Sequence, residues 1–64
     1  MDRREVRRKT LAAVAEIESR HDFLETMVRD IDASGDPIIA GELQKRLDQL
    51  ADWVDKLYVW AGNI

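Results

Sequence analysis

A short segment, Gly35-Asp36-Pro37, separates two long stretches of helical periodicity in this chain. Glycine readily adopts the left-handed backbone conformation that closes a helix, so Gly35 is expected just past the first helix. Asp36 can accept a hydrogen bond from a free amide of the next helix, and Pro37 suits a first helical position because it has no N–H to leave unbonded. A connection this short predicts an all-α fold of two antiparallel neighbouring helices, an αα-hairpin in a single domain. The expected ranges are residues 2–34 for the first helix, 35–36 for the turn and 37–61 for the second helix.

In the first stretch, the seam residues recur at alternating intervals of three and four positions. This rhythm is typical of a helix that packs against another helix. One seam position is polar, because it is occupied by the single histidine of the chain. The seam consists of Val14, Ile17, His21, Leu24, Val28 and Ile31.

The second stretch repeats this rhythm and has a wider apolar face. A neighbouring line of Ile39, Trp53 and Trp60 extends the face to about half of the helix circumference. An apolar face of this width is more than one partner helix can cover. The seam consists of Ala40, Leu43, Leu47, Leu50, Val54, Leu57 and Ala61.

Folding the chain back at the turn brings the two seams into matching layers. The residue numbers of each facing pair add to 71, as they do for Val28 with Leu43 and for His21 with Leu50. The shared phase of the two seams supports an antiparallel hairpin. In the same register, residues 3–9 extend past the end of the second helix and have no partner within the hairpin.

The chain needs a source of stability beyond its own core. Its 64 residues fall below the roughly 70–80 at which one core supplies comfortable stability. It has no cysteine for a disulfide or a thiolate zinc site. Self-association is the remaining source of stability. The part of the second helix's apolar face that the first helix cannot cover predicts a homodimer that forms a four-helix bundle with coiled-coil-like packing. The expected dimer interface comprises Ile39, Leu50, Trp53, Leu57, Tyr58 and Trp60.

Positive charge is concentrated at the start of the chain, although the whole chain has a net charge of −3. One interpretation is a solvated helix end with local ion pairs. The other is a binding patch, because Arg and Lys neutralise phosphates or acidic partners without reading a base sequence. The residues of this basic segment are Arg3, Arg4, Arg7, Arg8 and Lys9.

Glu18, His21 and Glu25 share one side of the first helix, which makes them the most chemically interesting cluster. Metal-binding bundles place further glutamates opposite such a histidine, whereas the register here places Leu50 there. We therefore expect a boundary histidine paired with a carboxylate. We expect no catalytic residue, no metal and no cofactor, and hence no enzyme.

The segment Ser19-Arg20-His21-Asp22-Phe23-Leu24, with Met27, resembles the region around the phospho-accepting histidine in dimerisation hairpins of citrate-sensor and sporulation-type phosphotransferases. Those hairpins also dimerise into four-helix bundles. The resemblance implies His21 as a phospho-acceptor, with Asp22 beside it. An asparagine usually follows four residues after that histidine, and this chain has Glu25 there.

A second resemblance overlaps the first. The segment Leu24-Glu25-Thr26-Met27-Val28, followed by Ile31-Asp32 and Gly35-Asp36, resembles the stretch before the turn in the small subunit of bacterial exonuclease VII. Two helical families that match the same region indicate a shared hairpin pattern.

These observations predict a small non-enzymatic interaction or regulatory protein that acts as a homodimeric helical bundle. Its expected partners are a second copy of itself and an unidentified protein. The alternatives are a nucleic-acid-associated adaptor that uses the basic segment, and phosphotransfer through His21. No apolar run is long enough for a membrane span, so we expect a cytoplasmic protein without membrane attachment.

Overall fold

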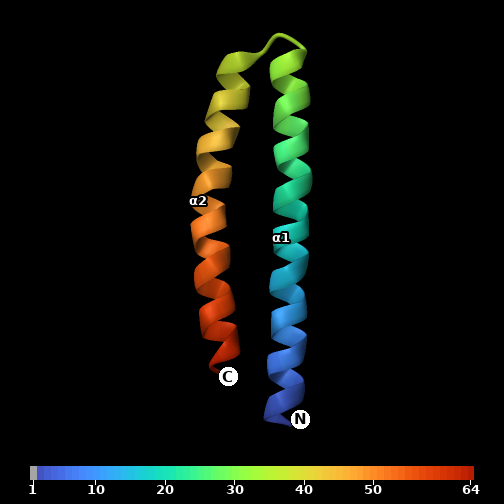
Figure 1. Cartoon of the computed structure of the whole chain (residues 1–64), viewed down its shortest axis with the longest axis vertical. Coiled ribbons are helices and arrows are strands. Elements are labelled where there is room, and N and C mark those ends of the chain that lie inside the picture. Colours follow the sequence, from blue (N-terminus) through green and yellow to red (C-terminus); the bar gives the residue numbers. More distant parts are fainter. Residues whose placement is uncertain (1) are drawn as a thin grey trace.

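Two antiparallel helices that pack side by side make up the structure, a computed structural model that describes residues 2–64 (Figure 1). Helix α1 spans Arg3–Ala33 and helix α2 spans Pro37–Gly62. The molecule measures 50 × 15 × 11 Å, and its radius of gyration of 15.1 Å exceeds the roughly 11 Å of a compact domain of this length. The predicted all-α hairpin is confirmed.

The turn has the backbone geometry that its residue types favour. Gly35 adopts a positive φ of 100°. Its amide donates to the Asp32 carbonyl at 3.1 Å, and the Asp36 amide donates to the Ile31 carbonyl at 3.3 Å. These two bonds satisfy the carbonyls at the end of α1 in the manner of a Schellman motif. The Asp36 carboxylate then accepts from the Ile39 amide at 3.3 Å, which caps α2.

A single line of side chains on each helix forms the contact between the two helices. Its members recur every seven residues, and each is buried. We call this line the inner row. It consists of Val14, His21 and Val28 on α1, and of Ala40, Leu47, Val54 and Ala61 on α2.

The inner rows interdigitate instead of meeting head on. Val28 packs with Ala40 and Leu47 in one cluster, so its height along the hairpin falls near Leu43, as the register predicts. Leu43, however, does not lie inside the contact, because it is 39% exposed. The register therefore gives the correct height of each layer, but only one member of a layer such as Val28 with Leu43 is buried.

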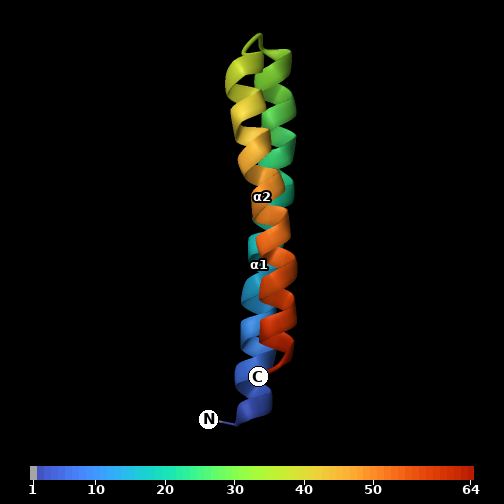
Figure 2. The same cartoon turned by 90° about the vertical axis from the view of Figure 1, so that its left-hand side faces the viewer.

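The first turns of α1 extend past the last residues of α2 (Figures 1 and 2). The basic segment begins at this end, because α1 starts at Arg3. Within residues 2–64, neither helix has an apolar stretch long enough and free enough of charge to cross a membrane.

Candidate functional site

A second line of apolar side chains runs beside the inner row and remains open to solvent. About 100° of rotation separates successive residues in a helix, so side chains three positions from the inner row lie to one side of it. In an antiparallel pair, these side chains from both helices reach the same side of the hairpin. The most exposed of them are Ile17 at 40%, Leu24 at 47%, Leu43 at 39% and Leu57 at 38%.

Larger side chains of α2 extend this apolar surface. Trp53 is 61% exposed, Trp60 is 73% exposed and Ile39 is 49% exposed. They follow the open line at the next helical position, so the two lines form one continuous surface. We call this surface the open face, and it consists of Ile17, Leu24, Ile31, Ile39, Leu43, Leu50, Trp53, Leu57 and Trp60.

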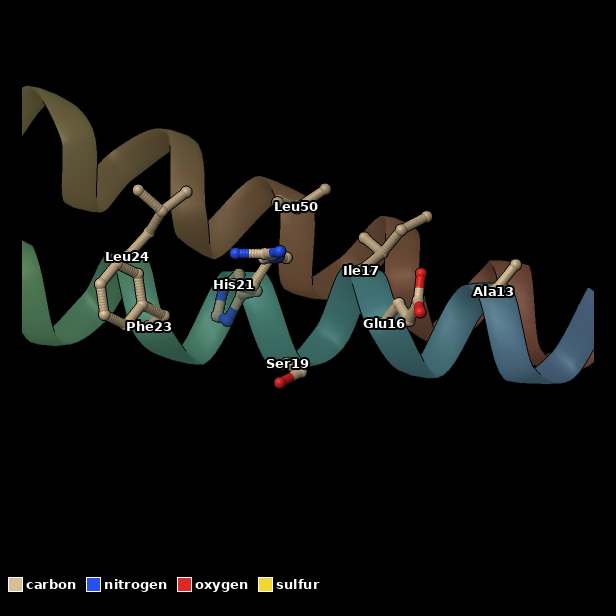
Figure 3. A pocket seen from close by; sticks show the side chains of 9 residues that line it. Ala13, Glu16, Ile17, Ser19, His21, Phe23, Leu24 and Leu50 are labelled. Carbon is tan, nitrogen blue, oxygen red and sulfur yellow. The ribbon is translucent and has the colours of Figure 1, made fainter.

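A groove with a volume of about 630 Å³ crosses the middle of the open face. Figure 3 shows Ile17 and Leu24 of α1 beside Leu50 of α2 along its apolar wall. Glu16 and Arg20 contribute charged groups to the lining. The mostly apolar lining suits the side chains of another helix.

Five of the six residues predicted for a dimer interface lie on the open face, and Tyr58 does not. Tyr58 packs on the other side of the inner row, against the cluster formed by Val14, Val54 and Ala61. Its hydroxyl donates to the Glu18 carboxylate at 3.2 Å. Partial burial raises the pKa of the Tyr58 hydroxyl, and the negative charge of Glu18 raises it further.

The contribution of α1 to the open face was absent from the expected interface. Every residue of that expected set belongs to α2. The missing members, Ile17 and Leu24, were visible in the sequence as seam positions. The seam pattern predicts that they contact the other helix, but only one member of each layer is buried in the structure.

His21 is the only polar residue of the inner row, and both of its ring nitrogens have partners. It is 6% exposed. Nε2 lies 2.8 Å from the Leu47 carbonyl oxygen, so this nitrogen carries a hydrogen and donates. Nδ1 lies 3.4 Å from an Asp22 carboxylate oxygen and 3.3 Å from a Glu25 carboxylate oxygen. The buried histidine therefore joins a polar network that links the two helices and opens to the surface at Asp22.

This network favours the protonated imidazolium. The hydrogen bond to the Leu47 carbonyl raises the pKa of His21, burial lowers it, and Asp22 and Glu25 raise it again, so the net shift is upward. A neutral ring would turn the lone pair of Nδ1 toward two carboxylates, which is unfavourable.

The same atoms form the group of candidate metal ligands in residues 2–64. The ligand atoms of His21, Asp22 and Glu25 lie within 4.8 Å of one another. All three come from α1, and Asp22 is 74% exposed at its side chain. The group therefore joins one buried imidazole to two carboxylates of the same helix, one exposed and one half-buried.

A phospho-acceptor histidine must present a ring nitrogen to its phosphoryl donor. His21 is buried and bonded at both nitrogens within a single hairpin. Because phosphotransfer would first require the network to open, we base no function on it.

The side chains of the basic segment are all exposed. Lys9 forms a salt bridge of 3.3 Å with Glu5 one turn away. Asp2 caps the helix by accepting from the Arg4 amide at 3.2 Å, and this carboxylate offsets part of the positive charge at the helix start. The other basic side chains form no salt bridge within residues 2–64, which leaves a cationic end on the hairpin.

Comparisons with known proteins assign this chain to no family. Neither the protein-family models, nor the curated proteins, nor the solved structures contain a match to it.

Proposed function

We propose that this protein is a small non-enzymatic interaction or regulatory protein that acts as a homodimeric four-helix bundle. The proposal rests on the open face, because a large exposed apolar surface marks a site of contact with another molecule. A two-fold pairing of open faces would bury the same residues in both copies. The outer sides of the four helices would stay available to a protein partner.

The exposed area of the hairpin supports pairing with a surface of similar size. A compact monomer of 7.4 kDa has an accessible surface of about 4200 Å², whereas this hairpin has 5100 Å². The excess, about 900 Å², is close to the roughly 800 Å² that each partner buries in a stable protein interface. A second copy of the hairpin is therefore large enough to cover the open face.

A pair of matched substitutions tests the proposal. Trp53 and Val59 are similarly exposed, at 61% and 63%, but Val59 lies on the outer side of α2, away from the open face. Wild-type protein is expected to sediment as a dimer at low micromolar concentration. Trp53→Glu should shift it toward monomer, because a charge would be buried in the interface, and Val59→Glu should leave the dimer unchanged. A folded wild-type monomer, or equal effects of both substitutions, would refute a dimer through this face.

The cationic end supports a second candidate, an adaptor that associates with nucleic acid. Arg3, Arg4, Arg7 and Arg8 are exposed on the first turns of α1, at the end of the helix that extends past α2, so phosphates can approach this end of the hairpin (Figure 1). Replacement of all five basic residues by alanine should abolish salt-sensitive retention of RNA or DNA, while Lys45→Ala with Lys56→Ala on α2 should not. Binding that persists in the first variant, or that is absent in wild type, rejects this candidate.

A further inference from the structure

We propose that the two hairpins of the dimer lie end for end, with the basic end of each copy beside the acidic turn of the other. This inference rests on the homodimer proposed above and adds its orientation. A two-fold bundle can also be built with both turns at the same end. Charge and side-chain size distinguish the two arrangements.

The two ends of the hairpin carry opposite net charge. Residues 2–9 hold five basic and two acidic side chains, a net charge of +3. Residues 28–38, which surround the turn, hold Arg29 against three acidic side chains, a net charge of −2. These acidic residues are Asp30, Asp32 and Asp36.

These charges cannot neutralise each other within one hairpin. The molecule is 50 Å long, whereas salt screens charges beyond about 8 Å at physiological ionic strength. Glu42 already bridges Lys45 and Arg46 locally, but Asp30 and Asp32 form no salt bridge within residues 2–64. A second copy turned end for end brings cationic and anionic ends together, whereas a copy in the same direction places like charges side by side.

Side-chain size also differs between the two ends of the open face. Both tryptophans of the face, Trp53 and Trp60, lie in the half near the chain termini. The half near the turn presents aliphatic side chains, such as Ile39 and Leu43. End-for-end pairing sets the aromatic half of each copy against the aliphatic half of the other. Pairing in the same direction would gather all four indoles at one end.

Distance measurement between spin labels tests the orientation directly. The chain has no cysteine, so Ala33→Cys at the end of α1 gives one labelling site per copy, on the exposed outer side of the helix. Because α1 has 31 residues, end-for-end pairing predicts a distance of about 40–50 Å between the two nitroxides. A label at Asn63→Cys, at the opposite end, should also give a long distance.

Each outcome of this measurement has a defined meaning. A long distance at both sites that disappears on dilution with unlabelled protein supports the proposal. A distance of about 20 Å or less at Ala33→Cys overturns the orientation and leaves the dimer standing. The absence of any dipolar coupling, together with a monomer in sedimentation, overturns both the dimer and its orientation.

Charge reversal provides an independent check. Arg3→Glu, Arg4→Glu and Arg7→Glu should raise the dimer Kd by at least about tenfold at low salt if the ends pair with their opposites. Glutamate near a helix N-terminus favours the helix, so weaker dimerisation would not reflect a weaker α1. Adding Asp30→Lys and Asp32→Lys should restore the affinity. An unchanged Kd after the first reversal overturns the proposal, because same-direction pairing merely exchanges one like-charge contact for another.

Discussion

The inner row and the open face are both mainly apolar and lie on the same two helices, yet the inner row is buried and the open face is exposed to solvent. The inner row uses small side chains, valine and alanine above all, with Val54 only 3% exposed and Ala40 only 4% exposed. The open face carries most of the larger ones, including both tryptophans. Small residues let the two helices approach closely, but they bury little area. The hairpin thus leaves most of its larger apolar side chains exposed.

The largest expected effect separates the inner row from the outer surface of the same helix. Val54→Asp places a charge in the sealed contact and should cost more than about 3 kcal/mol, enough to unfold a chain of this size. Val59→Asp makes the same chemical change on the exposed outer side of α2 and should leave the helical circular dichroism signal intact. If both variants stay folded, the inner row is not the core.

A smaller effect is expected on the open face. Leu24→Ala should raise the Kd of the proposed dimer about tenfold, because Leu24 is half exposed in one hairpin and pairing of the open faces would bury it. Ile38→Ala removes a side chain that is 76% exposed on the outer side of α2, and it should change the Kd little. Sedimentation equilibrium compares the two variants. Equal Kd values would mean that the open face is not the contact between copies.

The polar member of the inner row predicts a pH dependence. The pKa of His21 is raised in the folded state, so its stabilising contribution is complete below the unfolded value of about 6.5 and is lost as the pH rises through the folded value. The melting temperature should therefore fall between pH 6 and pH 9. Leu47 from α2, and Asp22 and Glu25 from α1, supply the groups that hold the proton.

His21→Leu is the control for this pH dependence. It should flatten the pH profile and raise the melting temperature at pH 9 by about 5 °C, equivalent to about 1 kcal/mol for a chain of this length. Thermal melts of both proteins across the pH range measure it. A pH slope that survives in His21→Leu would place the titrating group elsewhere.

The smallest effect concerns the side of the hairpin that faces away from the open face. Tyr58→Phe removes the hydrogen bond to Glu18 but keeps the ring that packs on Val14 and Val54. The melting temperature should fall by about 2 °C or less, because a mostly exposed hydrogen bond exchanges readily with water. A fall as large as that of an open-face variant would show that Tyr58 is buried in the assembly.

The fold was predictable from the sequence because the turn and the seams indicate the same hairpin. The capping roles of Gly35 and Asp36 follow from local chemistry, and the heights of the layers follow from residue counting. Which seam residues point inward could not be read in this way. Leu43 and Leu47 have the same side chain and both belong to the seam, yet Leu47 is 6% exposed and Leu43 is 39% exposed.

The candidate site was predictable in part for the same reason. Trp53 and Trp60 lie to one side of their seam, so their exposure follows from helical geometry. Tyr58, which the sequence also predicts for the interface, lies at the opposite flank, where its hydroxyl reaches Glu18 across the hairpin. The partners of His21 depend on which backbone carbonyl of α2 lies within reach, and periodicity carries no information about that.

The turn also bears on a misfolding route, domain swapping. Without a break, the two helical stretches could fuse into one rod whose halves pair with those of another rod. Pro37 would cost about 3 kcal/mol inside such a continuous helix, and Gly35 would add about 1 kcal/mol. The left-handed conformation of Gly35 has no place in that rod. The turn therefore holds the chain in the closed hairpin, and substitution of Gly35 and Pro37 by alanine would open a path to exchanged helices and long filaments.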